Sequence, residues 1–83
     1  MKIFELVRGG TAAALEVNGE HVVVLSSRSS PPGSSLEAML DGGTLRIKVR
    51  SCRKVEPDDG GRLYRIEGRF LSLTREQRES LAR

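Results

Sequence analysis

The sequence predicts a mainly β fold, a small antiparallel β-barrel of five or six strands with a C-terminal helix. Two stretches carry most of this prediction. Residues 44–71 alternate apolar and polar side chains on both sides of an EPDDGG connector, and residues 11–26 flank Asn18-Gly19. Both patterns indicate β-hairpins, because strand side chains alternate between faces and tight turns favour residues that tolerate positive φ. Turn residues also recur at close spacing between the other apolar runs, as they do in small barrels.

The predicted elements follow one another along a single domain that spans residues 1–83. In order, they are a strand at 3–7, a hairpin of 11–17 and 20–26, a loop at 26–33, a strand at 36–40, a turn at 41–43, the long hairpin within 44–71, and a helix at 74–83. Thr74 and Gln77 have the spacing of a capping box at the start of that helix. Few apolar residues lie on the helix, so we expect it to dock on the barrel or fray.

The turn residues also suggest a register for each hairpin. In the first, Val17 opposite Glu20 would bring Leu15 to Val22 and Ala13 to Val24. In the second, Val55 opposite Arg62 would pair Ile47 with Phe70, Val49 with Gly68, Ser51 with Ile66 and Arg50 with Glu67. Registers shifted by two residues would keep the same faces, so the assignment to faces is firmer than the register. Gly68 is expected at a bend or a close approach of two backbones.

Charge is distributed unevenly along the chain. Residues 1–43 carry three basic and five acidic side chains, a net charge of −2, whereas residues 44–83 carry eleven basic and six acidic ones, a net charge of +5. The proposed register projects five cations from one side of the long hairpin, with Glu67 as the only acid among them: Arg46, Lys48, Arg50, Arg65 and Arg69. This basic face is the candidate partner-binding site, and a solvated surface is the alternative interpretation.

The composition of the chain indicates the cellular compartment in which the protein is expected. With one cysteine the chain cannot form an internal disulfide framework, which favours a reducing compartment. No apolar run is long enough to cross a bilayer. The opening residues carry Glu5 and Arg8 where a secretory signal would be apolar. We therefore expect a cytoplasmic protein without membrane insertion.

Little in the sequence points to catalysis. His21 is expected across the strand from Glu16, a pair that acid–base chemistry could use, but a surface cross-strand pair is the simpler interpretation. Cys52 is expected on the polar face between Arg50 and Arg53, where cations favour a thiolate, although a plain surface cysteine is the commoner case. No P-loop, GxGxxG or metal-ligand spacing is present. Neither an enzyme, a cofactor nor a metal site is expected.

From Ser30 onward the sequence resembles the second half of a PilZ domain. The segments SPPGSSLEAML and TLRIKVRSCRKVEPDDGGRLYRIEGRFLSLTREQRESL are similar to the family's Pro-Gly turn, strand, long hairpin and glycine-containing strand that ends in Phe. The resemblance implies a six-stranded β-barrel with a C-terminal helix, in a family of which many members bind the bacterial second messenger cyclic di-GMP. The match to the family's lxLsxexRexL terminus comprises Phe70, Leu71, Leu73, Arg78 and Leu81.

The two ligand motifs of that family are not formed in this sequence. An RxxxR motif cannot form because Arg8 is the only arginine upstream of the first hairpin. In the second motif, [DN]xSxxG, Glu16 takes the acidic or amide position, Asn18 that of the serine and His21 that of the glycine. Two guanidiniums normally clamp the ligand. The resemblance therefore implies a divergent member that does not bind cyclic di-GMP tightly.

These observations favour a non-enzymatic regulatory or protein-interaction domain of bacterial signalling, with an acidic protein as the expected partner. A small basic barrel that binds nucleic acid is the second hypothesis, and a degenerate cyclic di-GMP receptor is the third. Nucleic acid stands second because binding of single strands usually needs exposed aromatic side chains, whereas Tyr64 and Phe70 are expected on the apolar face.

Overall fold

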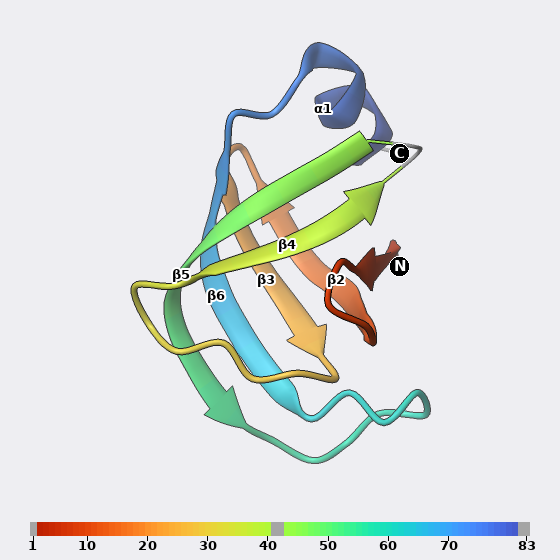
Figure 1. Cartoon of the computed structure of the whole chain (residues 1–83), viewed down its shortest axis with the longest axis vertical. Helices are drawn as coiled ribbons and strands as arrows, with labels where there is room; N and C mark the ends of the chain where they lie inside the picture. Colours follow the sequence, from red (N-terminus) through yellow and green to blue (C-terminus); the bar gives the residue numbers. More distant parts are fainter. Residues whose placement is uncertain (1, 41–42, 82–83) are drawn as a thin grey trace.

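The structure, a computed structural model, describes residues 2–40 and 43–81. Within them lie six strands and one helix: β1 (Ile3–Leu6), β2 (Thr11–Asn18), β3 (His21–Ser26), β4 (Ser35–Leu40), β5 (Gly43–Lys54), β6 (Tyr64–Leu71) and α1 (Arg75–Leu81). The strands close an antiparallel barrel in the order β1-β2-β3-β6-β5-β4, and α1 lies at one end of it (Figure 1). The predicted β-barrel with a C-terminal helix is thus confirmed. Most of the predicted turn at 41–43 and the end of the predicted helix, 82–83, lie outside the described residues.

Apolar side chains from every strand fill the barrel interior. Because strand side chains alternate, each strand contributes every second residue to this core. Tyr64 was expected on the same side as Phe70, and it packs against the core. The buried core residues are Phe4, Leu6, Ala12, Val22, Val24, Leu36, Ala38, Leu40, Leu45, Ile47, Val49, Ile66 and Phe70.

The predicted capping box starts α1. The backbone N–H of Gln77 donates to Thr74 Oγ1 at 3.1 Å, and the Thr74 N–H donates to Gln77 Oε1 at 3.0 Å. Gln77 Nε2 also donates to the Thr44 carbonyl at 3.1 Å, which ties the helix to β5. Leu73 and Leu81 pack against the barrel core. The short helix is therefore stabilised by its contacts with the barrel, as expected for a helix with few apolar residues.

The first hairpin forms as predicted, but its turn is displaced by one residue. Asn18 pairs with His21, and the two turn residues are Gly19 and Glu20. Gly19 has φ 63°, and Asn18 is not at positive φ. This pattern fits a type II′ turn, which needs glycine only at its first central position. The predicted pairing of Val17 with Glu20 is therefore wrong.

A bulge at Leu15 shifts the first hairpin again. The register changes between Ala14 and Glu16, so Leu15 has no partner and is exposed. The extra residue lets β2 bend around the barrel. The two apolar contacts predicted for this hairpin are corrected accordingly: Val17, not Leu15, lies opposite Val22, and Ala14, not Ala13, lies opposite Val24.

The long hairpin keeps its predicted register only as far as a bulge at Arg50. Ile47 pairs with Phe70 and Val49 with Gly68, as predicted. Beyond the bulge every pair moves by one residue, so the predicted pairs of Arg50 with Glu67, Ser51 with Ile66 and Val55 with Arg62 are wrong. Instead, Ser51 lies opposite Glu67, Cys52 opposite Ile66, and the Val55 N–H donates to the Leu63 carbonyl.

Gly68 lies opposite the bulge, at the predicted close approach of two backbones. A Cβ atom built there would overlap the Lys48 carbonyl oxygen and stand 3.0 Å from Ile47 Cγ2. The prediction for this glycine is confirmed. The bulge also reverses the alternation of β5, so Cys52 turns toward the core instead of the polar face where it was expected.

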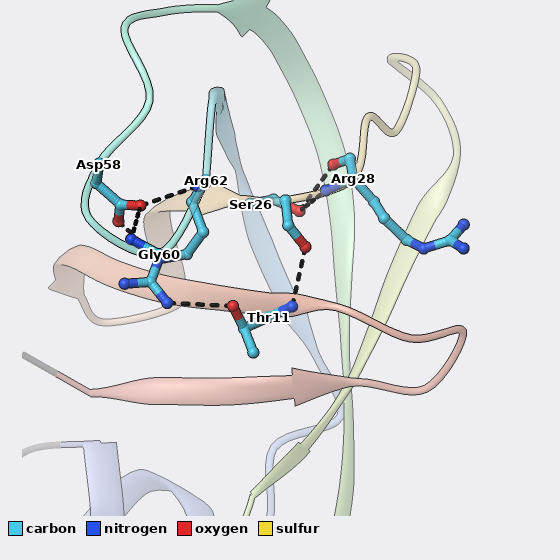
Figure 2. Close-up of polar contacts among 7 residues, drawn as sticks. Thr11, Ser26, Arg28, Asp58, Gly60 and Arg62 are labelled. Carbon is cyan, nitrogen blue, oxygen red and sulfur yellow. Dashed lines mark hydrogen bonds and ion pairs between the residues drawn. The ribbon is translucent and has the colours of Figure 1, made fainter.

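The β5–β6 loop folds back onto β2 through one acid and one arginine (Figure 2). Asp58 Oδ1 accepts the N–H groups of Gly60 and Arg62 at 3.0 and 2.9 Å, and Oδ2 accepts Arg62 Nε at 2.7 Å. Arg62 also donates to Thr11 Oγ1 at 3.1 Å. The loop is thus anchored on the barrel, which fixes the end of the hairpin.

Asp58→Asn tests how much the Asp58 carboxylate stabilises this anchor. The Arg62 N–H, with further hydrogen bonds, holds the pKa of Asp58 below its ordinary value of 3.8, against a desolvation that raises it. A carboxyl whose pKa is lower in the folded than in the unfolded protein stabilises the fold fully when the pH is above the unfolded-state pKa. This stabilisation is lost as the pH falls through the folded-state pKa. We expect wild type to melt at a higher temperature than Asp58→Asn at neutral pH, and the two to converge below pH 3.8. A constant gap in melting temperature down to acid pH would contradict this role.

Candidate basic interaction face

The structure brings the five predicted cations together on the outer surface of one hairpin. Arg46, Lys48 and Arg50 project from β5, and Arg65 and Arg69 from β6. These five residues form the basic face. Lys48 lies directly opposite Arg69. Four of the five are exposed, and Arg65 is half-buried, with 33% of its side chain accessible.

The basic face is more neutralised than the hairpin alone predicts. Glu67 was expected to be the only acid among the cations, yet two further carboxylates reach them from the neighbouring strands. Glu20 precedes β3 and Glu37 belongs to β4, and the pairing of these strands with β6 and β5 was not readable from sequence. The closest contacts are Arg69 Nη2 to Glu20 Oε2 at 3.1 Å, Arg46 Nη2 to Glu37 Oε2 at 3.7 Å and Arg65 Nη1 to Glu67 Oε2 at 3.8 Å.

Arg50 differs from the other four cations. Lys48 Nζ donates to the Gly33 carbonyl at 2.8 Å, and the remaining three contact carboxylates. Within residues 2–40 and 43–81, the Arg50 side chain makes neither a hydrogen bond nor an ion pair, and it is exposed at the bulge. Exposed ion pairs contribute little to stability, about 0–1 kcal/mol each. An unpaired arginine is the cation most available to a partner.

A groove of about 460 Å³ lies beside Arg50 on the basic face. Val49 and Gly68, both buried residues, belong to its lining, and Gly68 lies where the backbones of β5 and β6 approach closely. The seven lining residues of this bulge groove are Glu20, His21, Lys48, Val49, Arg50, Gly68 and Arg69. With three cations and one carboxylate, its walls suit a carboxylate or another anion.

The four positions that match the family's ligand motifs do not converge. Asn18 and His21 face each other at the β2–β3 turn, and Glu16 pairs with Val23. Arg8 lies in the turn at the opposite end of β2. An eight-residue strand, at about 3.3 Å per residue, puts roughly 20 Å between Arg8 and Asn18. The motif positions therefore cannot hold one ligand together.

The predicted pair of His21 with Glu16 is wrong. Because the turn uses Gly19 and Glu20, Asn18 takes the place across from His21. The nearest carboxylate comes from β6 instead, with Glu67 Oε1 at 3.9 Å from His21 Nε2. His21 therefore belongs to the rim of the bulge groove rather than to a separate acid–base pair.

Among the residues that the structure describes, no group of three or more His, Cys, Asp or Glu side chains could hold a metal ion. In the same residues, no helix has the length and hydropathy needed to cross a membrane.

Comparison of this chain with protein-family models, with curated proteins and with solved structures finds no match.

Proposed function

We propose that this chain is a PilZ-like, non-enzymatic regulatory module of bacterial signalling that binds an acidic protein through its basic face. The observation that carries the proposal is the bulge groove of about 460 Å³, beside which the exposed Arg50 has no acceptor among the described residues. A carboxylate of the partner would satisfy Arg50 with a charge-assisted hydrogen bond. The module acts in the cytoplasm, where its single cysteine stays reduced.

The architecture supports the PilZ-like part of this proposal. A closed six-stranded barrel with a helix at one end is the arrangement that the resemblance implies. The residues of the closing match also have structural roles. Phe70 is buried in the core, Leu73 and Leu81 pack against it, and Arg78 lies 3.7 Å from Glu20.

The module is proposed to bind cyclic di-GMP weakly or not at all. The ligand carries two phosphates, and the family holds them with paired guanidiniums. Here Arg8 is separated from Asn18 and His21 by the length of β2. Loss of one charge-assisted hydrogen bond typically costs about 1.5–3 kcal/mol. A third hypothesis, a degenerate receptor for this nucleotide, is therefore less well supported.

An acidic protein fits the basic face better than nucleic acid does. The chain has three aromatic residues, and Phe4 and Phe70 are buried while Tyr64 packs against the core. None of the three offers the exposed platform on which bases stack. Three carboxylates also lie among the cations, a mixed pattern that favours matched pairing with a protein surface over a run of phosphates.

Arg50→Glu provides the test of this function. Wild type, Arg50→Glu and Arg75→Glu would each be used to capture proteins from a lysate of the native host. Arg75 lies on α1 with 93% of its side chain exposed, so the control makes the same charge change away from the basic face. We expect wild type and Arg75→Glu to retain the same acidic partner and Arg50→Glu to lose it. The affinity of that partner should fall with added salt, because rim charges are screened.

Calorimetry with two further ligands separates the alternatives. Cyclic di-GMP and a short single-stranded DNA would each be titrated into the wild-type protein. Micromolar binding of the nucleotide would refute the ligand-free proposal, and tight binding of the DNA through Arg50 would favour the nucleic-acid hypothesis. Equal capture of the partner by wild type and Arg50→Glu would show that the basic face is only a solvated surface.

A further inference from the structure

A second pocket, of about 380 Å³, lies at the end of the barrel away from α1. It is enclosed by the β1–β2 turn, the β3–β4 loop and the start of β4. Two arginines and four serines supply most of its polar lining: Arg8, Arg28, Ser29, Ser30, Ser34 and Ser35. We refer to it as the serine pocket. It shares no lining residue with the bulge groove.

The two arginines of the serine pocket are free to bind a ligand. Arg8 and Arg28 are both exposed, and neither side chain forms an ion pair or a hydrogen bond within residues 2–40 and 43–81. They come from segments twenty positions apart, which only the closed barrel brings to one cavity. Two guanidiniums without carboxylate partners create a positive potential in the pocket.

The backbone that carries Arg28 is held in place by a buried serine (Figure 2). Ser26 is fully buried, and its Oγ accepts the Arg28 N–H at 3.0 Å and donates to the Arg28 carbonyl at 2.7 Å. Figure 2 shows that the Arg28 side chain extends away from Asp58 and Arg62. Arg28 is therefore positioned by the fold without being used in the loop anchor.

The turn that carries Arg8 is held as firmly. The Gly9 N–H donates to the Leu6 carbonyl and the Leu6 N–H to the Gly10 carbonyl, both at 3.0 Å. The two arginine segments are also joined to each other. The Thr11 N–H donates to Ser27 Oγ, and the Ser27 N–H donates to the Thr11 carbonyl, both at 2.9 Å. The backbones that carry the two arginines are therefore fixed before a ligand binds, which lowers the ordering cost of binding.

The serines differ in what they offer. Ser34 Oγ donates to the Pro31 carbonyl at 2.5 Å, so in its 2.6 Å contact with Ser30 Oγ the Ser30 hydroxyl must be the donor. These two hydroxyl hydrogens are thus used inside the loop. Ser29 and Ser35 make no hydrogen bond through their side chains within the described part of the chain, which leaves two hydroxyl donors for a ligand.

We infer that the serine pocket binds the phosphate group of a small ligand. Guanidinium groups match phosphate oxygens in a bidentate geometry, and serine hydroxyls complete the donor set. The pocket volume lies near the lower end of the range for small-molecule sites, about 300–1,000 Å³, which suits a phosphate with a small substituent. The pocket also lies at the barrel end opposite Asn18 and His21, so it does not reproduce the family's nucleotide site.

One carboxylate limits the charge that the pocket accepts. Glu37 belongs to the lining, and its Oε2 lies 3.7 Å from Arg46 Nη2. It therefore sets a negative charge at the edge of the cavity, partly offset by Arg46. Removal of this charge should strengthen the binding of any phosphate, so Glu37→Gln is expected to bind more tightly than wild type.

An NMR titration tests the inference with inorganic phosphate and glycerol 3-phosphate as probes. We expect saturable shifts of amide signals around Arg8 and in residues 28–35. Arg8→Gln and Arg28→Gln should each weaken binding by at least about tenfold, the loss expected for one charge-assisted hydrogen bond. Arg75→Gln, which removes an equal charge on α1, should leave binding unchanged. Tighter binding of the ester than of free phosphate would identify a phosphorylated small molecule as the ligand, and equal binding would identify phosphate itself.

Three outcomes would overturn the inference. The first is the absence of saturable shifts with both probes. The second is a set of shifts centred on Lys48, Arg50 and Arg69, which would assign phosphate to the bulge groove. The third is unchanged affinity in both Arg8→Gln and Arg28→Gln, whose well-dispersed spectra would show that the variants are folded.

Discussion

Gly68→Ala should lower the free energy of unfolding by about 3 kcal/mol, the upper part of the range for overpacking a core. The added methyl group would overlap the Lys48 carbonyl oxygen and press on Ile47 Cγ2. A carbonyl oxygen in a β-ladder cannot turn aside as a flexible side chain can, so β5 and β6 would have to separate at the bulge. For a domain of this size, such a loss lowers the melting temperature by roughly 4–8 °C per kcal/mol. Thermal unfolding followed by circular dichroism would measure it.

Gly43→Ala is the matched control for that experiment. The nearest atom to a methyl group at Gly43 is Nε2 of Gln77, at 3.2 Å, which belongs to a flexible side chain. Gly43 is not at positive φ, so the backbone tolerates alanine. We expect a change of less than about 1 kcal/mol. Equal effects at Gly43 and Gly68 would refute the close approach at the bulge.

Phe4→Ala should destabilise the barrel by about 3–5 kcal/mol, the usual cost of truncating a buried phenylalanine. Phe4 is fully buried and lies in β1, the shortest strand at four residues. β1 closes the barrel by pairing with both β2 and β4. Because so few backbone pairs hold this strand, its attachment depends strongly on the buried side chains of Phe4 and Leu6. Chemical denaturation would measure the total loss, and hydrogen exchange would locate it.

The neighbouring residue supplies the control for Phe4. Ile3 has 53% of its surface exposed, so Ile3→Ala should cost less than about 1 kcal/mol. In Phe4→Ala we expect the amides of β1 and β4 to exchange faster than those of β5 and β6. An equal increase in the amide exchange rate in all strands would mean that β1 does not open independently of the rest of the barrel.

Gly68 links stability to the proposed partner site. The absence of a side chain at Gly68 lets β5 and β6 approach at the bulge, and Gly68 also belongs to the lining of the bulge groove. Separation of the two strands by a larger residue at this position would also displace Val49 and Arg50, which line the groove. Loss of stability and loss of partner binding are therefore expected to occur together at this position, whereas Arg50→Glu should affect binding alone.

The local signals in the sequence were sufficient for the elements and for most of their faces. Alternation in β6 and in the part of β5 before the bulge identified Ile47 and Phe70 as interior residues, because a strand with one buried face repeats every second residue. The capping box at Thr74 and Gln77 was read in the same way, from hydrogen bonds that close within one turn. Such features depend on neighbours in sequence.

These local signals did not predict where the register of each hairpin changes. The bulges at Leu15 and Arg50 each add a residue that the alternation of side chains does not predict. Because of the bulge at Arg50, Cys52 faces the core instead of the expected polar face. Gly68 was a partial clue, since it was expected at a close approach of backbones. A bulge forms where closure of the barrel demands a bend, and that demand comes from strands distant in the chain.

The candidate sites likewise combine features that the sequence predicts with features that depend on the tertiary structure. The cations of the basic face lie on one hairpin, so alternation was enough to place them on a common side. Their neutralisation by Glu20 and Glu37 depends on which strands flank that hairpin, and the serine pocket depends on Arg8 and Arg28 meeting across a closed barrel. The tertiary structure decided both, because the strand order β1-β2-β3-β6-β5-β4 brings together segments that local chain geometry leaves independent.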